Sequence, residues 1–274
     1  MITSTSNPKI KSIRSLQSSS RSRREEGLFV VEGVRLVEEA LSASWQAQLV
    51  IHTDDQSMRG QAVIQGFAAQ GTPIEAVTPH VMKAASDTQT PQGLLAVFAV
   101  QKLALPKTLD FILVPAGVRD PGNLGTILRS AEAAGADLVV LTPGSVDPYN
   151  PKVVRGSAGA VFHVPVITAT IDDVLAAGFA TLGTTSHDAL GRTVVPYTDA
   201  DLTGRIAVVM GNEAAGLPTD WTDVEGPIGS WVTIPHRGRS ESLNVAMAAT
   251  VLVFEAARQR VGRRDQSSTS NAAG

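Results

Sequence analysis

Between residues 111 and 234, short apolar segments alternate with helix-like segments, and this alternation limits the possible folds more than any other feature. The predicted strands are Phe111–Pro115, Leu138–Leu141, Val164–Ile167, Ala180–Thr184, Ile206–Met210 and Trp231–Ile234. The predicted helices are Asn123–Ala134, Pro151–Ala160, Ile171–Ala177, a short piece near Pro218–Val224, and a last one over Val245–Ala257. Apolar strands that alternate with helices predict an α/β fold with a mostly parallel sheet covered on both faces.

Four of these strands are followed by loops rich in glycine and small polar residues. Three such loops start at Gly117, Gly211 and Ile234, and the fourth strand itself ends in the small residues 183–185. Since the carboxyl ends of parallel strands meet at one edge of the sheet, these loops together predict one ligand site. The stretch from Ile234 alone is also consistent with a capped core helix, because Asn244 and its serine neighbours can cap free backbone N–H groups. The apolar helix that follows is expected to be buried around most of its circumference.

Several familiar site types are absent from the sequence. The span from Gly211 to Gly216 has the glycine spacing of a P-loop, but Leu217 stands where the lysine belongs. There is no G-x-G-x-x-G after a strand and no G-x-S-x-G nucleophile elbow. The chain has no cysteine, and its five histidines lack the spacing of metal ligands, so we expect no metal.

The first hundred residues predict a smaller α/β domain with a basic N-terminal arm. The predicted domains are 1–103 and 108–264, with a disordered polar tail at 265–274. Residues 1–24 hold six cations and no acid: Lys9, Lys11, Arg14, Arg21, Arg23 and Arg24. On a protein of net charge −3 such an arm suits the phosphate backbone of a nucleic acid, although a solvated helix face or a flexible tail has the same composition. No apolar run is long enough to cross a bilayer and no hydrophobic signal segment is present, so we expect a soluble cytoplasmic protein without a membrane partner.

Three motifs give a family resemblance. The stretch Asp120–Ala131 resembles the first motif of the SpoU (TrmH) family of RNA 2′-O-ribose methyltransferases. Val209–Leu217 resembles the second motif, and Ile234–Ala246 resembles the third, in the same order and at similar separations. Phe29–Gly33 and the helix after it resemble the ribosomal-protein-like substrate-binding domain of many members.

The resemblance implies a fold, a cofactor and a set of residues. The fold is a SPOUT-type parallel sheet whose C-terminal segment forms a deep trefoil knot, an exception to the rule against knots, preceded by the small α/β RNA-binding domain. The co-substrate is S-adenosylmethionine (AdoMet), and the family completes its site with a second copy of the chain, which implies a homodimer. By motif matching the AdoMet pocket is lined by Leu182, Thr184, Met210, Gly211, Ile234, Leu243 and Asn244. The catalytic positions are Asn123 and Arg129, supported by Glu213, Ser242 and Asn244.

The implied reaction is methyl transfer to a ribose 2′-hydroxyl in structured RNA. Without the resemblance, Arg129 is better explained as an arginine that extends from a core helix to solvent, or that pairs with a carboxylate such as Glu132 or Asp137. A guanidinium stays charged, so we interpret Arg129 as a group that orients the ribose or its phosphate, not as a base. The basic arm, together with Arg35, is expected to bring in the RNA, with large-subunit (23S) rRNA as the first expectation. The alternatives are a tRNA substrate, methylation that confers antibiotic resistance, a non-catalytic ribosome-assembly factor with the same fold, and a nucleotide-binding metabolic enzyme.

Overall fold

The structure is a computed structural model that describes residues 1–106, 108–185, 192–212, 216–223, 225–239 and 242–270, with no account of the side chains of 262–270. It divides into two compact units, and each is described by itself. Unit 1 comprises residues 1–102 and 147–163, and unit 2 comprises residues 103–146 and 164–274. Residues 147–163 therefore lie in the first unit, whereas the sequence-based boundary placed them in the second domain.

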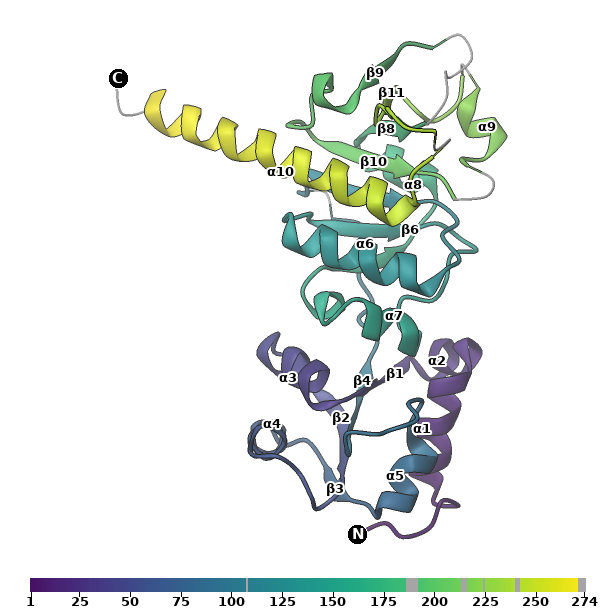
Figure 1. The fold of residues 1–274 in the computed structure, drawn as a ribbon, viewed down its shortest axis with the longest axis vertical. Coiled ribbons are helices and arrows are strands. Elements are labelled where there is room, and N and C mark those ends of the chain that lie inside the picture. Colours follow the sequence, from purple (N-terminus) through teal and green to yellow (C-terminus); the bar gives the residue numbers. More distant parts are fainter. Residues whose placement is uncertain (107, 186–191, 213–215, 224, 240–241, 271–274) are drawn as a thin grey trace. The chain divides into compact units, whose positions relative to one another are not determined.

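Unit 1 is built on a four-stranded sheet of mixed direction (Figure 1). Its elements are α1 (Pro8–Ser18), α2 (Ser20–Glu26), β1 (Leu28–Glu32), α3 (Val34–Ser42), β2 (Ala47–His52), α4 (Met58–Ala69), β3 (Ile74–Ala76), α5 (Pro79–Ala85), β4 (Leu94–Ala99), α7 (Pro151–Gly156) and the 3-10 turn η1 (Ala160–Phe162). The strand order is β1-β4-β2-β3, with β4 antiparallel to both of its neighbours and β2 parallel to β3.

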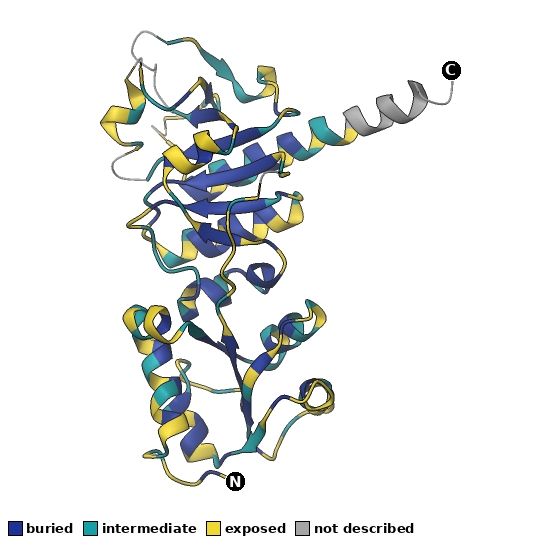
Figure 2. Cartoon of the chain, turned by 180° about the vertical axis from the view of Figure 1, so that it is seen from behind, coloured by how far each residue is buried: buried dark blue, intermediate teal, exposed yellow. Residues whose placement is uncertain are grey.

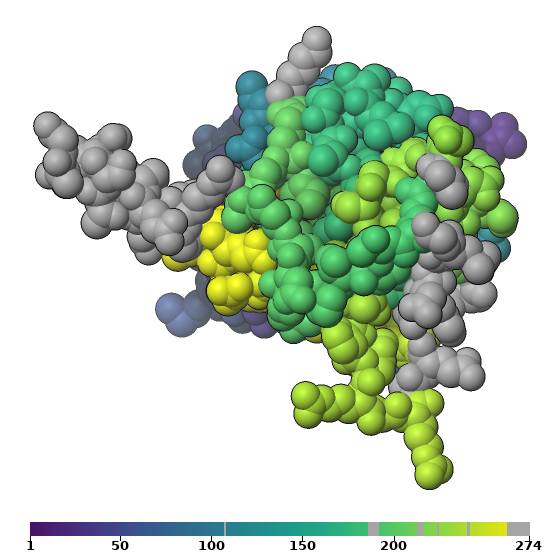
Figure 3. All heavy atoms as spheres, turned by 90° about the horizontal axis from the view of Figure 1, so that it is seen from above, coloured from purple at the N-terminus to yellow at the C-terminus, as the bar shows by residue number. Residues whose placement is uncertain are grey.

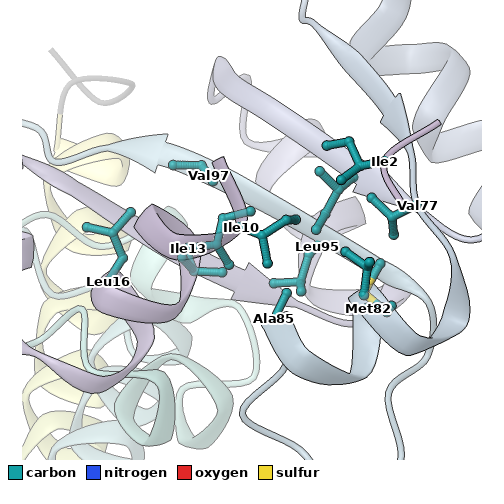
Figure 4. Close-up of a cluster of buried hydrophobic side chains, with 12 residues drawn as sticks. Ile2, Ile10, Ile13, Leu16, Val77, Met82, Ala85, Leu95 and Val97 are labelled. Carbon is teal, nitrogen blue, oxygen red and sulfur yellow. The ribbon is translucent and has the colours of Figure 1, made fainter. Parts of the chain in front are cut away.

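The first helix, α1, is amphipathic and covers one face of this sheet. Asn7 caps it by accepting a hydrogen bond from the backbone N–H of Lys9 at 2.9 Å, and Pro8 occupies the first turn, where no N–H is required. Its apolar side chains Ile10, Ile13 and Leu16 are almost wholly buried against α5 and the sheet (Figure 4). The basic arm of the sequence is therefore a folded helix with one buried face.

Residues 147–163 join unit 1 through an aromatic cluster. The rings of Tyr149 and Phe29 lie 4.5 Å apart, and those of Phe162 and Trp45 lie 5.5 Å apart. The Trp45 indole also donates a hydrogen bond to the carbonyl oxygen of Phe162 at 3.0 Å. Offset and edge-on ring contacts of this kind add to the hydrophobic gain of burying large rings. The predicted helix at Pro151–Ala160 is shorter here, ending at Gly156 before η1.

Arg23 also holds this segment, and the prediction that Arg23 contacts RNA is wrong. Only 3% of Arg23 is exposed, and its Nε donates to an Asp147 carboxylate oxygen at 2.6 Å. A second guanidinium nitrogen donates to the carbonyl oxygen of Leu16. A charge this deep needs such partners, since burial of an unpaired ion is costly. The sequence shows a run of cations but not which of them points inward.

Unit 2 contains a seven-stranded sheet in which all pairings are parallel, as the alternating pattern predicted. Its elements are β5 (Phe111–Pro115), α6 (Pro121–Ala133), β6 (Leu138–Leu141), β7 (Val166–Thr168), α8 (Ile171–Ala176), β8 (Ala180–Thr184), β9 (Val194–Pro196), the 3-10 turn η2 (Tyr197–Asp199), β10 (Ile206–Met210), α9 (Thr219–Thr222), β11 (Ser230–Thr233) and α10 (Val245–Ser270). The strand order is β7-β6-β5-β10-β8-β11-β9, and the short edge strand β9 was not predicted. The central strands are buried, as their dark colour in Figure 2 shows.

The C-terminal helix α10 packs against α6 with one face (Figure 1). Buried residues such as Ala249 and Leu252 form that face, and the Thr250 and Ser130 hydroxyls lie 2.6 Å apart between the helices. Met247 and Phe254 are 63% and 48% exposed, so burial around most of the helix is not what this chain shows. The helix runs to Ser270, beyond the predicted start of a disordered tail at residue 265, because a helix once nucleated extends at little further cost. Residues 271–274 lie outside the described residues. In the described parts of the chain we find no helical segment with the length and hydropathy of a bilayer-spanning helix.

The buried Tyr149 predicts an alkaline limit to the stability of unit 1. Burial raises the pKa of its hydroxyl from 10.0 to about 12, and the Asp147 carboxylate adds to the rise. The folded chain thus holds this proton more tightly than the unfolded chain. Its stabilising effect, about 2–3 kcal/mol, is complete below pH 10 and is lost as the pH rises to about 12. Urea denaturation of wild type and Tyr149→Phe across this range should show the steeper loss in wild type; parallel curves would contradict the assignment.

Arg23 and its sequence neighbour Arg24 form a matched pair for a test of stability. Arg24 is exposed, so we expect Arg24→Ala to change the free energy of unfolding by no more than about 0.5 kcal/mol. Arg23→Ala leaves Asp147 without its buried partner and should lower that free energy by about 3 kcal/mol or more. Urea denaturation followed by circular dichroism measures both values. An Arg23→Ala protein as stable as wild type would show that the buried ion pair is not structural.

Candidate active site at the sheet edge of unit 2

Parallel pairing brings the predicted loops together at one edge of unit 2. The neighbouring strands β5, β10, β8 and β11 all run in the same direction, so the segments after Pro115, Met210, Thr184 and Thr233 leave the sheet at the same edge. Figure 3 shows one face of this unit, at whose surface lie described parts of the connection between β8 and β10 (residues 192–205, green) and of the stretch before α10 (residues 235–239, yellow-green). The four strand ends that the sequence singled out are therefore adjacent in space.

The loop after β5 positions the start of α6. Asp120 caps this helix by accepting a hydrogen bond from the backbone N–H of Asn123 at 2.8 Å, and Pro121 fills the first turn. Gly117, with a φ of 64°, makes the turn that only glycine adopts without strain, and its N–H donates to the Thr142 hydroxyl at 2.9 Å. Asn123 is held in the first helical turn, partly exposed.

The first and third motifs meet through two asparagines. The Asn244 side-chain nitrogen donates to the Asn123 side-chain oxygen at 3.0 Å. The Asn244 side-chain oxygen accepts from the backbone N–H of Ala246 at 2.9 Å, so Asn244 also caps α10. The capping expected from this polar cluster is thus supplied by Asn244, while Ser240 lies outside the described residues. Ser242 is exposed two residues before Asn244.

The loop after β10 closes on itself and bonds to the loop after β5. Asn212 and Gly216 exchange two backbone hydrogen bonds, of 3.0 and 2.8 Å. The Asn212 side chain donates to the carbonyl oxygen of Gly117 at 2.7 Å. A Cβ on Gly211 would lie 2.4 Å from the Gly216 carbonyl carbon, so no side chain fits there. The sequence analysis missed Asn212, although a polar residue directly after a buried strand was a usable signal.

Glu213, proposed as a supporting residue, lies outside the described residues. The other catalytic candidate, Arg129, is exposed on α6 and forms no ion pair among the residues that the structure describes. The pairing with Asp137 that was an alternative is not found, because Asp137 accepts from the backbone N–H groups of Asp110 and Phe111 at 2.9 and 2.8 Å. The guanidinium is therefore available to a ligand. Six residues along a helix turn the direction of a side chain by about 120°, so Arg129 and Asn123 leave α6 on different sides.

The residues predicted to line the AdoMet pocket differ in exposure. Leu182 and Met210 are core side chains, 3% and 1% exposed, so they offer the site their backbone more than their side chains. Thr184 and Ile234 are partly buried, whereas Leu243 is 37% exposed at the same edge. The predicted AdoMet-binding residues thus include buried strand ends and, at Leu243, a small exposed apolar surface.

One polar atom in this loop cluster lacks a partner. His236 Nε2 is buried and makes no hydrogen bond to the described residues, which is unusual for a buried ring nitrogen. This edge of the sheet is suited to a flat ligand with polar groups, because it combines His236 Nε2 with the apolar Leu243 and with Gly211, which has no side chain. Across the described ranges, no group of three or more His, Cys, Asp or Glu residues could hold a metal ion.

In unit 1 the predicted RNA-binding cations differ in burial and in pairing. Arg23 is buried, as described above. Lys9 is paired with Glu75, and Arg21 with Glu25 at 2.7 Å. Arg35 is also exposed. A hydrogen bond from Arg59 lowers the pKa of Glu38, and the charge of Arg35 adds a smaller contribution. Three further cations are exposed and form no ion pair within the described ranges: Lys11, Arg14 and Arg24.

Comparison with known proteins gives consistent matches to both units. Residues 110–254 match the model of the SpoU rRNA Methylase family, and residues 7–96 match an MRM3-like substrate binding domain. The 23S rRNA (guanosine(2553)-2′-O)-methyltransferase RlmP of Bacillus subtilis is 32% identical over 260 residues, which covers 92% of this chain and 97% of that protein.

Comparison with solved structures gives matches of the same kind. The AdoMet-bound rRNA methyltransferase of Sinorhizobium meliloti is 32% identical with a TM-score of 0.80, over 94% of this chain and 97% of that one. The SpoU methyltransferase AviRb of Streptomyces viridochromogenes, solved with AdoMet, is 28% identical with a TM-score of 0.80, over 93% of this chain and all of that one. With more than half of its length matched by the family model and with these relatives spanning both units, the chain belongs to the SpoU rRNA Methylase family.

Proposed function

We propose that the protein transfers a methyl group from AdoMet to a ribose 2′-hydroxyl in large-subunit (23S) rRNA. The observation that carries this proposal is the meeting of two motif loops in one hydrogen bond, from Asn244 to Asn123. Relatives whose names state 23S rRNA 2′-O-methylation support the substrate class. A substrate in the ribosome would place the protein in the cytoplasm.

The alternatives fit less well. A non-catalytic assembly factor would be expected to lose Asn123, Arg129 or Asn244, and all three are present. A tRNA substrate is less well supported: three relatives that match both units are named as rRNA methyltransferases, and a fourth is named as a tRNA/rRNA methyltransferase. A metabolic nucleotide enzyme would leave unit 1 and its substrate-binding family match without a purpose.

The sheet edge has features suited to AdoMet. Gly211, against which the backbone of Gly216 and Leu217 packs, can offer backbone hydrogen-bonding groups. Ile234 and Leu243 offer apolar contact for adenine, and His236 Nε2, which has no partner among the described residues, offers a polar contact. Thr184, Leu182 and Met210 complete the proposed lining through the strand ends. When bound, AdoMet supplies a methyl group already activated by the positive charge on its sulfur, so the proposal needs no metal.

The protein must hold the ribose 2′-oxygen in line with that methyl group and manage the hydroxyl proton. The hydrogen-bonded amides of Asn123 and Asn244 give two fixed polar groups at this point. Arg129 remains charged at any physiological pH, so its proposed role is to orient the ribose or its phosphate and to stabilise negative charge on the oxygen. Glu213 and Ser242 are proposed as supporting groups by motif matching.

We also propose the trefoil knot and the homodimer. In the strand order, β11 lies beyond β8, on the far side of β10 from β5. After β11 the chain returns, and α10 packs against α6, the helix that follows β5. This path is consistent with a threaded C-terminal segment. Met247, Phe254 and Val261 recur every seventh residue on the exposed side of α10, as at a helix–helix interface. Since Arg129 and Asn123 leave α6 on different sides, a second copy would allow one site to use both residues.

Two substitutions separate cofactor binding from catalysis. Arg129→Ala should leave AdoMet affinity within about twofold of wild type and lower methyl transfer at least about 100-fold, the scale of losing one charge-stabilising group. Gly211→Ala forces the backbone at residues 216–217 to move, so it should weaken AdoMet binding first. Calorimetry measures binding, and transfer of radiolabelled methyl groups to transcribed 23S rRNA measures activity. No AdoMet binding by wild type at millimolar concentration would refute the proposed function, and undiminished transfer by Arg129→Ala would refute the role of Arg129.

The dimer has its own test. Wild type should sediment at twice the chain mass of 28.7 kDa, and Met247→Glu with Phe254→Glu should shift it to the single-chain mass by placing charge in the apolar stripe. Gln61→Glu with Gln65→Glu adds the same charge to exposed positions of α4 and should leave the mass unchanged. A wild-type monomer with full activity in dilute solution would rule out the dimer.

A further inference from the structure

Unit 1 contains an open cleft between α1 and the C-terminal end of α5. Its volume is about 420 Å³, within the range of sites that hold small ligands or segments of larger ones. The lining residues are polar or small: Lys11, Arg14, Ser15, Gln17, Ser18, Ala84, Ala85, Ser86 and Asp87. This cleft lies wholly within unit 1 and shares no residue with the site at the sheet edge of unit 2.

The cations of the cleft come from the outer face of α1. Ile10, Ile13 and Leu16 fix the orientation of the helix by pointing into the core (Figure 4), so Lys11 and Arg14, three residues apart, share the opposite side. Both are exposed, and neither forms an ion pair among the described residues. Two neighbouring positive charges that are not paired with a described carboxylate would attract an anion.

Residues 85–87, which form one wall of the cleft, are fixed by hydrogen bonds to buried side chains. The buried Gln17 side chain donates to the carbonyl oxygen of Ala85 at 2.9 Å, which joins α1 to the end of α5. The buried Glu32 carboxylate accepts from the Ser86 hydroxyl and from the Asp87 backbone N–H, the latter at 3.0 Å. A wall fixed by such contacts loses little entropy when a ligand binds.

The single acid of the lining is already paired. The Asp87 carboxylate accepts from Arg155 of α7 at 2.8 Å, so its charge is offset within unit 1. The charge left to the cleft is therefore positive. The lining has no aromatic ring, so bases have no surface to stack on. Its chemistry suits a sugar–phosphate backbone, with a guanidinium and an ammonium for phosphate oxygens.

We propose that this cleft binds the sugar–phosphate backbone of the RNA substrate, independently of base sequence, through Lys11 and Arg14. The proposal rests on the RNA methyltransferase function proposed above and adds to it a specific docking site. The cations of the basic arm therefore differ in function. Arg23 stabilises the fold, Lys9 and Arg21 are held by acids, and Lys11 with Arg14 contact RNA.

The test compares cleft and control variants of the full-length protein. Lys11→Ala with Arg14→Ala removes both cleft cations, and Ser18→Trp fills the lip of the cleft without changing charge. The control, Lys102→Ala with Lys152→Ala, removes two exposed cations of unit 1 that do not line the cleft. Binding to transcribed 23S rRNA is measured at several salt concentrations, and AdoMet binding and methyl transfer are measured in parallel.

We expect both cleft variants to bind RNA at least about tenfold more weakly than wild type, with AdoMet binding unchanged. Loss of two phosphate contacts should also reduce the slope of log affinity against log salt by about 1.4–1.8 in Lys11→Ala with Arg14→Ala. The control should bind within about twofold of wild type. Equal effects in the cleft and control variants would overturn the proposal in favour of diffuse attraction.

The remaining outcomes separate the cleft from the enzyme. Normal RNA binding by the cleft variants, in a protein whose wild type methylates rRNA, would overturn the cleft and leave the proposed function intact. Wild type that binds RNA through the cleft but never transfers a methyl group would instead contradict the proposed function. Polyglutamate that displaces the RNA at equal charge concentration would reassign the cleft to an acidic protein segment.

Discussion

The position of β10 between β5 and β8 is the constraint on which the site depends. Parallel hydrogen bonding to both neighbours fixes the direction of all three strands, so the segments after Pro115, Thr184 and Met210 leave the same edge. The two side-chain bonds from Asn212 to Gly117 and from Asn244 to Asn123 then bring together loops that are distant in sequence. A shift of β10 to a sheet edge would separate the first motif from the second, whatever their residues.

Unit 1 is stabilised by different interactions from those that bring the loops of unit 2 together. Its aromatic cluster draws in residues 147–163, and the Arg23–Asp147 ion pair holds the start of that segment. The chain therefore crosses between the units three times, after Lys102, Val146 and His163.

Much of this could be predicted from the sequence, for identifiable physical reasons. The strands of unit 2 are buried on both faces, so they read as apolar runs, and five of the six predicted strands fall within one residue of the observed bounds. Motif matching named Asn123 and Asn244 as site residues, but the hydrogen bond between them was not predicted. The burial of the Arg23 side chain could not be predicted, because a run of cations on a helix does not show which of them forms an ion pair with Asp147, more than a hundred positions later. The partition of residues 147–163 was missed for the same reason, since Tyr149 and Phe162 find their partners through long-range packing.

The two units use different kinds of interaction, and this has a consequence for how the protein works. The site in unit 2 is built largely from amides, glycines and apolar side chains, whose contacts are insensitive to ionic strength. The cleft proposed to bind phosphate in unit 1 presents two exposed charges, whose attraction to phosphate would weaken steeply with salt. On the proposed function, salt should therefore lower RNA affinity more than AdoMet affinity. A protein of net charge −3 avoids general attraction to nucleic acid and keeps its positive charge on the face where it is needed. Selection among RNAs then depends on shape around the cleft and on contacts at the methylated ribose, because backbone contacts alone carry no sequence information.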